Sequence, residues 1–600
     1  MRSRLAHSSL LEIADMASAH SRPVLRIAMV AFLFTALAAA DRSSVARAET
    51  PRAAAQQPEA RDWPSFVDEL LEAYFAAHPS FAVNAGRHEF DGKLPDWSAP
   101  SIEREVGRLE QSRAAALAFA DGALSREQRF ERDYVISVID DDLFWLRDAR
   151  QPFANPAFYV DNGLDPSTYV TVPYAPLDQR LRAFIGYAKA IPNAVAQIRA
   201  NLETPMPRTF VDYGIAAFAG FAEFYRNDVP LAFADVADDR LQSELKAALG
   251  PAAQAMADLA AWLESGKPQA NDAYVLGPER FALMVRMTEG VTTGLDKLEA
   301  IGRGDLERNL AALEAACREF LPNGAIPACV EKQAANKPEG GAVDGARNQL
   351  AQLKQYIADH RIVTIPGTEQ ALVEEAPAYK RQNFAYINIP GPYEKSLPSV
   401  YYIAPPDPKW PKAEQDAYLP GKADLLFTSV HEVWPGHFLQ FLHSNRSSWR
   451  FGRVFVGYAF AEGWAHYTEE LMVEEGLATG APELHVGQLL NALLRNVRLV
   501  CAIGLHTKGM TVAECEQLFK DKAYQDAGNA RQQAARGTYD PAYLNYTMGK
   551  LMILKLRADW QAENPGKPRR EFHDQLLSRG GPPIPLLRGE MLEAAGGELF

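Results

Sequence analysis

Apolar residues recur at intervals of three and four along most of the chain, which is the periodicity of amphipathic α-helices. The same pattern returns from Ala423 to the C-terminus. The clearest earlier runs are Phe66–Phe75, Leu181–Leu202, Leu241–Leu263 and Leu295–Phe320. The periodicity therefore predicts a mainly α protein, built as a large multi-helical fold.

Strand patterns are few and lie near the middle of the chain. Ser399–Ile403 is β-branched and aromatic and is bounded by Pro398 and Pro405, so it is the best candidate strand, with Asn383–Ile389 as its candidate partner. We find no internal repeat and no true linker after Trp63. The sequence thus predicts a small sheet inside one domain over 63–600, with a helical lobe of about 63–360 and a second lobe of about 361–600.

The N-terminus has the pattern of an export signal. Ile27–Ala40 is an apolar run preceded by Arg22 and Arg26 and followed by small residues, which predicts a signal peptide over 1–48. An Ala-, Gln-, Arg- and Pro-rich linker over 49–62 follows. The run is shorter than the ~20 residues that span a bilayer, and no later stretch is expected to span one. We expect a periplasmic or secreted protein without stable membrane association after cleavage; an uncleaved anchor is the alternative.

Composition narrows the class of protein. The 600 residues are 47% hydrophobic, which is enough for a large core, and the net charge of −14 argues against a nucleic-acid partner.

The four cysteines form two local pairs, Cys317 with Cys329 and Cys501 with Cys515. Export makes disulfides feasible, with buried free thiols as the alternative, and the sequence favours the first pair. No cysteine lies near the cleavage region, so a lipid anchor is not expected.

The strongest chemical signal is a cluster of metal-ligating residues. The segment His431-Glu432-Val-Trp-Pro-Gly-His437 is followed by Glu462, which lies 25 residues after His437. Two imidazoles and a carboxylate are the usual protein ligands of a catalytic zinc, and they leave a fourth position open for water. A glutamate beside the first histidine is placed to accept the proton of that water.

The spacing of the two histidines needs a special backbone. In H-E-x-x-H motifs the histidines are four residues apart and share one helix face, whereas six residues of regular helix give about 600°, equivalent to 240°, and opposite faces. Pro435 lacks an amide hydrogen, and Gly436 tolerates the unusual dihedrals of a distortion. We therefore predict a bulge that returns His437 to the side of His431.

The motif and its surroundings resemble a known family. HEVWPGHFLQ and the later AEGWAHYTEE resemble the bacterial DUF885 proteins, whose pattern is H-E-x-x-P-G-H followed by E-G-W-A-x-Y-x-E. Further similar segments are His78–Gly86, Leu276–Phe281, Ile389–Tyr393, Gly504–His506 and Tyr539–Gly549. The family is similar to the helical zinc peptidases of the thimet oligopeptidase and carboxypeptidase Taq type. The resemblance implies a two-lobed zinc-peptidase-like fold with a small sheet near the active-site cleft.

The resemblance also implies residue roles. It makes His431, His437 and Glu462 the ligands of Zn²⁺ and Glu432 the general base. Glu469 lies at i+7 from Glu462, on the same helix face, and is a candidate acceptor for the free N–H of a ligand imidazole. His466, at i+4, is a second candidate. Salt bridging or capping on a half-buried helix is the alternative for both.

The negative oxygen that develops during hydrolysis needs a hydrogen-bond donor besides the metal. Tyr546 and His506 are the candidates, because both lie in family-like segments of the C-terminal part. Tyr539 and Tyr543 are less favoured. Core packing is the alternative for Tyr546, which is expected in the first turns of a helix where Gly549 permits close approach of a neighbour.

These observations predict a zinc-dependent hydrolase that cleaves peptide bonds of oligopeptides. One alternative is a zinc amidase or esterase acting on a non-peptide or cell-wall fragment, and another is a non-catalytic, metal-stabilised binding protein. Glu432 disfavours the binding protein, because purely structural zinc sites usually have four protein ligands and no base. The sequence leaves open the substrate, the mode of cleavage and the oligomeric state.

Overall fold

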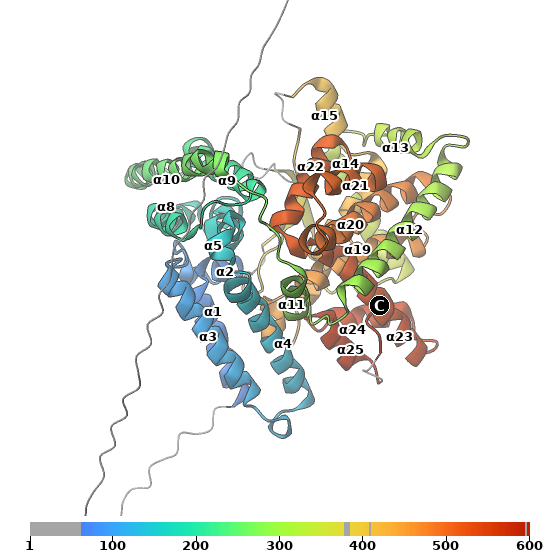
Figure 1. Ribbon diagram of the computed structural model, residues 1–600, viewed down its shortest axis with the longest axis horizontal. Coiled ribbons are helices and arrows are strands. Elements are labelled where there is room, and N and C mark those ends of the chain that lie inside the picture. Colours follow the sequence, from blue (N-terminus) through green and yellow to red (C-terminus); the bar gives the residue numbers. More distant parts are fainter. Residues whose placement is uncertain (1–61, 377–383, 396, 407–409, 594–596) are drawn as a thin grey trace, which may run out of the picture. The chain divides into compact units, whose positions relative to one another are not determined.

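The computed structural model describes residues 62–376, 384–395, 397–406, 410–593 and 597–600. The predicted signal peptide and residues 49–61 of the predicted linker lie outside these ranges. Residues 61–600 form one compact unit, which is mainly α-helical as predicted (Figure 1).

The first helices pack at the N-terminal end of the described chain. α1 begins where the Asp62 side chain accepts a hydrogen bond from the Ser65 amide at 2.9 Å, and α4 begins with a capping box between Ser125 and Gln128. Their bounds are α1 (Trp63–Ala77), α2 (Pro79–Asn84), α3 (Ala99–Leu117), α4 (Arg126–Leu143), α5 (Gln151–Ala154), α6 (Pro156–Tyr159) and α7 (Ser167–Thr171).

Three long helices then pack side by side and form most of a second hydrophobic core (Figure 1). They are α8 (Leu177–Asn201), α9 (Arg208–Ala232) and α10 (Asp239–Gly266). Phe184, Tyr225 and Met256 are fully buried between them. The apolar runs from Leu181 and from Leu241 are confirmed as helices, because their three- and four-residue spacing lines one face of α8 and of α10.

The next helices belong to the larger core of the protein. Their bounds are α11 (Pro278–Glu289), α12 (Leu295–Phe320), α13 (Ile326–Ala335) and α14 (Ala342–His360). α12 packs against the C-terminal helix α20, so the hydrophobic cores do not divide the chain at residue 360. The proposed lobes of about 63–360 and 361–600 stay a prediction.

A three-stranded sheet follows, with the order β1-β3-β2. β3 (Ser399–Ile403) pairs antiparallel with β2 (Ala385–Asn388), as predicted, and parallel with β1 (Ala371–Glu375). Asn383, at the edge of the predicted partner strand, lies outside the described residues. Tyr401 at the centre of β3 is fully buried and faces Val373 and Ile387 in register.

Helices form the rest of the chain. They are α15 (Lys412–Tyr418), α16 (Lys422–Glu432), α17 (His437–Ser444), α18 (Arg450–Val454), α19 (Tyr458–Glu474), α20 (Pro482–Thr507), α21 (Val512–Ala523), α22 (Ala527–Tyr539), α23 (Asn545–Glu563), α24 (Arg569–Leu577) and α25 (Ile584–Met591). Within the described residues, α20 is long and apolar enough by composition to cross a membrane, contrary to expectation, and 83% of its apolar window is buried inside the fold. A core helix passes the same test.

The backbones of α19 and α23 approach each other closely at Gly463 and Gly549. A Cβ added to Gly463 would lie 2.6 Å from Gly549 Cα, and one added to Gly549 would lie 2.1 Å from the Ala459 carbonyl oxygen. The prediction that Gly549 permits close approach is therefore confirmed. A buried Lys550 ammonium then pairs with Asp305 at 2.7 Å and so joins α23 to α12.

Both cysteine pairs are disulfide-bonded. Cys317 joins Cys329, and Cys501 joins Cys515. The first bond links α12 to α13, and the second links α20 to α21. The sequence favoured the first pair; the second is also oxidised.

Candidate metal centre

The motif helix is interrupted between the two histidines. α16 ends at Glu432 and α17 begins at His437, so the predicted bulge is a complete break between two helices. The Gly436 amide donates to the Val430 carbonyl at 2.9 Å, and Trp464 Nε1 of α19 donates to the Pro435 carbonyl at 2.9 Å. Proline disfavours a continuous helix here, because it has no amide hydrogen to donate and its ring clashes with the carbonyl four residues earlier.

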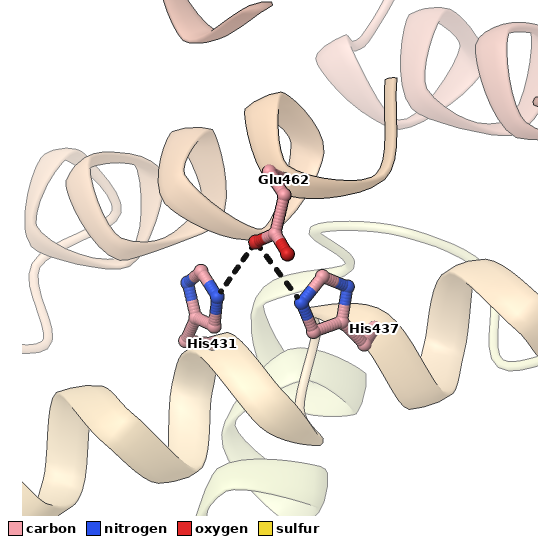
Figure 2. Close-up of side chains that lie close together, drawn as sticks. All are labelled: His431, His437 and Glu462. Atoms are coloured by element: carbon pink, nitrogen blue, oxygen red, sulfur yellow. Dashed lines mark ion pairs between the residues drawn. The ribbon is translucent and has the colours of Figure 1, made fainter. Parts of the chain in front are cut away.

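The break brings both imidazoles to one carboxylate. His431 Nε2 and His437 Nε2 lie 3.3 Å and 3.4 Å from the same oxygen of Glu462, Oε2 (Figure 2). The two rings are nearly perpendicular, at 86°, with centroids 4.8 Å apart. Glu462 projects from α19 across the ends of α16 and α17 (Figure 2). The structure thus brings together the three residues predicted as ligands.

The candidate ligand atoms are spaced as the ligands of a metal cation are. One potential ligand atom from each residue lies within 4.8 Å of the other two. Ligands about 2.0–2.2 Å from a tetrahedral zinc are roughly 3.3–3.6 Å apart, which agrees with the two observed distances. Glu462 Oε2 is buried and has no hydrogen-bond partner among the described residues, although a buried carboxylate oxygen normally has one. An oxygen that accepts no hydrogen bond and lies close to two imidazole nitrogens is what a metal site requires.

A buried network orients His431. Its Nδ1 donates to Glu469 Oε1 at 2.7 Å, which turns Nε2 toward Glu462. Burial alone would raise the pKa of Glu469, but the Arg495 guanidinium, 3.1 Å away, and His431 hold it well below its ordinary value. Glu469 therefore has the predicted geometry of an ionised acceptor. His437 Nδ1 is buried without such a partner among the described residues.

Glu432 and Tyr546 lie next to the three ligand residues and line the same cavity. Burial raises the pKa of Glu432 to about 7, against the opposing effect of His437. The Tyr546 ring lies 6.2 Å from the His431 ring, and the two rings are nearly parallel, at 15°. Its hydroxyl has no hydrogen-bond partner among the residues that the structure describes, and burial and the charge of Glu462 raise its pKa. Tyr546 is therefore a neutral donor facing the cavity.

His506 does not belong to this site, contrary to prediction. It is fully buried outside the cavity lining, where Nε2 donates to the Gly537 carbonyl at 2.8 Å and Nδ1 accepts from the Leu276 amide at 3.3 Å. Burial lowers its pKa to about 4. Because both ring nitrogens bind backbone groups, His506 ties α20 to α22 and to the loop before α11, and it has no free ring nitrogen for a substrate.

The remaining sequence candidates take other positions. His466 is fully buried, with Nδ1 3.6 Å from Glu469 Oε2, so it adjoins the supporting carboxylate and not the ligand cluster. Tyr539 lines the cavity, whereas Tyr543 is buried against Gly537.

The cavity has a volume of about 2230 Å³. Its walls come from both hydrophobic cores and include β2 residues such as Tyr386 and Ile387, so the sheet does lie beside the cleft. Pockets for small ligands are typically about 300–1,000 Å³, which makes this one large enough for an extended chain of several residues.

Sequence reasoning missed two arginines of the site. Arg495 and Arg498 project from α20 into this region and are both largely buried. The signal was present in the sequence, because two cations three residues apart interrupt the apolar run Leu493–Leu505. Buried arginines are rare without a partner, so such a pair indicates a site.

Comparisons with known proteins agree with the fold. A candidate lipoprotein of unknown function from Shewanella oneidensis is 22% identical, with a TM-score of 0.73 over 89% of this chain and 100% of that chain. Another from Colwellia psychrerythraea is 17% identical, with a TM-score of 0.70 over 88% of this chain and 97% of that chain. No curated protein matches. The sequence profile of the bacterial proteins of unknown function DUF885 matches residues 79–591, and the chain therefore belongs to that family.

Proposed function

We propose that the protein is a zinc-dependent hydrolase that cleaves peptide bonds of oligopeptides. His431, His437 and Glu462 would hold the ion. The observation that supports this most directly is the Glu462 oxygen that accepts no hydrogen bond from another described residue and lies close to two imidazoles at the wall of a cavity of about 2230 Å³. A zinc ion bound there supplies a Lewis acid for a carbonyl oxygen and lowers the pKa of an adjacent water toward ~7.

Glu432 then transfers the proton, and Tyr546 stabilises the developing charge. Glu432 accepts a proton from the attacking water, whose oxygen bonds to the peptide carbonyl carbon. The Tyr546 hydroxyl donates a hydrogen bond to the negative oxygen that develops there. Glu432 then returns the proton to the amine nitrogen as the C–N bond breaks. Each group lines the cavity and has no hydrogen bond to another described residue that would compete with this role.

Three features favour a catalytic over a structural ion. The cluster contains three ligand residues, whereas structural zinc sites usually have four. It opens to a cavity, and a base lies beside it. The size of the cavity favours a peptide over a small ester or amide.

Metal analysis and a peptide digest test the proposal. We expect about one zinc per chain in the purified protein, removed by chelation and restored by added Zn²⁺. Incubation with a mixed library of acetylated peptides, monitored by mass spectrometry, should give hydrolysis products only with the metal present. A zinc-loaded protein that leaves the whole library intact, or one that binds no zinc, would contradict the proposal.

Replacement of Tyr546 by Phe should lower kcat by ~10²-fold, with little change in KM or zinc content. The lost hydrogen bond exists mainly in the transition state, and the hydroxyl has no other partner among the described residues. Steady-state kinetics on one library substrate measures this effect. An unchanged kcat would leave Tyr546 as a packing residue beside His431.

We also propose that the protein is exported. The signal-type N-terminus, the two disulfides and the description of both structural neighbours as candidate lipoproteins support this location.

A further inference from the structure

Three arginines surround the ring of Tyr546, and one of them lacks a counterion. The guanidinium carbons of Arg498, Arg495 and Arg536 lie 4.6 Å, 5.8 Å and 6.0 Å from the ring centroid. Arg495 pairs with Glu469 at 3.1 Å, and Arg536 pairs with Asp540 at 2.8 Å. No carboxylate in the described parts of the chain pairs with Arg498.

Arg498 is nonetheless buried. It is 7% exposed and lines the cavity. Burial, together with the charges of Arg536 and Arg495, lowers its pKa, which shows that its surroundings oppose its positive charge. Buried charges in proteins are normally paired. An unpaired one facing a cavity therefore indicates a negatively charged ligand.

The orientation of the Arg498 side chain leaves the guanidinium edge with the two terminal nitrogens free. Nε donates to Gln533 Oε1 at 2.9 Å, and the guanidinium packs on the Tyr546 ring. These contacts hold the group in place and leave its two terminal nitrogens without a partner among the described residues. Two parallel N–H groups match the two oxygens of a carboxylate.

The position of Arg498 relative to the candidate metal centre indicates which carboxylate of a substrate it would bind. Tyr546 contacts both the Arg498 guanidinium and the His431 ring, at 4.6 Å and 6.2 Å. An extended peptide advances about 3.5 Å per residue, so a chain end held at Arg498 places a bond one to three residues upstream at the ligand cluster.

We propose that Arg498 binds the free C-terminal carboxylate of the substrate, so that the protein acts as a carboxypeptidase releasing one to three residues. This inference rests on the proposed hydrolase function, in which water adds across the peptide bond and the C-terminal fragment leaves as the free amine. It specifies the substrate class: peptides with an unblocked C-terminus, whatever their N-terminus.

The test compares acetylated peptide libraries that differ only at the C-terminus, as free acids and as amides. Wild-type protein should cleave the free acids with about 10–100-fold higher kcat/KM, the size that a charge-assisted contact contributes. Products should be shortened by one to three residues at the C-terminus. Equal cleavage of both libraries, or cuts far from the C-terminus, would overturn the inference while leaving the hydrolase intact. Cleavage of amides that contain acidic side chains near the cut would reassign Arg498 to side-chain recognition.

Two variants test whether Arg498 is the residue that binds the C-terminal carboxylate. Arg498→Gln should remove the preference for acids over amides by raising KM for the acids. Arg531→Gln, which removes an exposed arginine of α22 outside the cavity lining, is the matched control and should keep the preference. A preference that survives in Arg498→Gln would refute the assignment. Should this variant fail to fold, Arg498 stabilises the structure and the acid-to-amide ratio of the wild type decides.

A measurement of peptide binding without turnover distinguishes this inference from the hydrolase proposal. Zinc-loaded Glu432→Gln protein should bind one library peptide as the acid about 10–100-fold more tightly than as the amide, measured by calorimetry. Tighter acid binding by a protein that hydrolyses nothing would refute the hydrolase and keep the carboxylate site. Equal binding would refute the site.

Discussion

Glu432→Gln is expected to keep its zinc and lose about 10²–10⁴-fold in kcat. Glutamine has nearly the same shape as glutamate, but its amide cannot accept the proton of the attacking water. Glu432 is not among the three clustered ligand residues, and its carboxylate lines the cavity. Burial already opposes its charge and raises its pKa to about 7, so a neutral side chain should not destabilise the fold.

Zinc content and steady-state rates measure both parts of this expectation. Glu307→Gln is a suitable control, because Glu307 is exposed on α12 and does not line the cavity. This control should match wild type in rate and in metal. Full turnover in Glu432→Gln would assign the base to another residue, and loss of zinc would make Glu432 a metal ligand.

Gly436→Ala should abolish zinc binding and destabilise the protein by about 3 kcal/mol. A Cβ on this residue would lie 1.8 Å from the His431 carbonyl oxygen and 2.5 Å from that of Val430. These are backbone atoms of α16, so no side-chain rotation relieves the overlap. The two helices must separate, and His431 and His437 then no longer reach Glu462.

Thermal unfolding and metal analysis test this second expectation. Gly304→Ala is the matched control, since Gly304 lies exposed within α12 and an added Cβ would meet nothing within 4 Å. It should be as stable as wild type or more so, because alanine favours helix over glycine. A Gly436→Ala protein with wild-type Tm and zinc would show that the turn can adjust.

The helices were predictable because their apolar residues keep one period. β1 was not, because Ala371–Glu375 contains one buried residue, Val373, and ends in two charged ones, so it has no alternating pattern. Its strand conformation depends on parallel pairing with β3, which is a tertiary interaction.

The cluster of His431, His437 and Glu462 was predictable for a similar local reason, namely the type and spacing of these residues. The positions of the α20 residues relative to the cavity were not predictable, because they depend on which elements α20 packs against. His506 and Arg498 lie on this one helix, two turns apart, yet His506 binds the backbone of α22 and Arg498 faces the cavity. A sequence segment does not specify which neighbour each face of a buried helix meets. The distortion between His431 and His437 was predicted, but its form was not: α16 ends at Glu432 and a new helix begins at His437, where a bulge was expected.

The contact between Gly463 and Gly549 has a mechanical consequence. Glu462 precedes the first glycine directly, and Tyr546 precedes the second by less than one helical turn. With the two backbones touching, the spacing of ligand and tyrosine is fixed by main chain and does not depend on side-chain rotamers. Glu462 and Tyr546 thus behave as parts of one stiff frame. For the proposed hydrolase, a change of substrate range by evolution or by design is best sought elsewhere in the wall, where residues of α9 such as Tyr213 and Phe221 line the cavity.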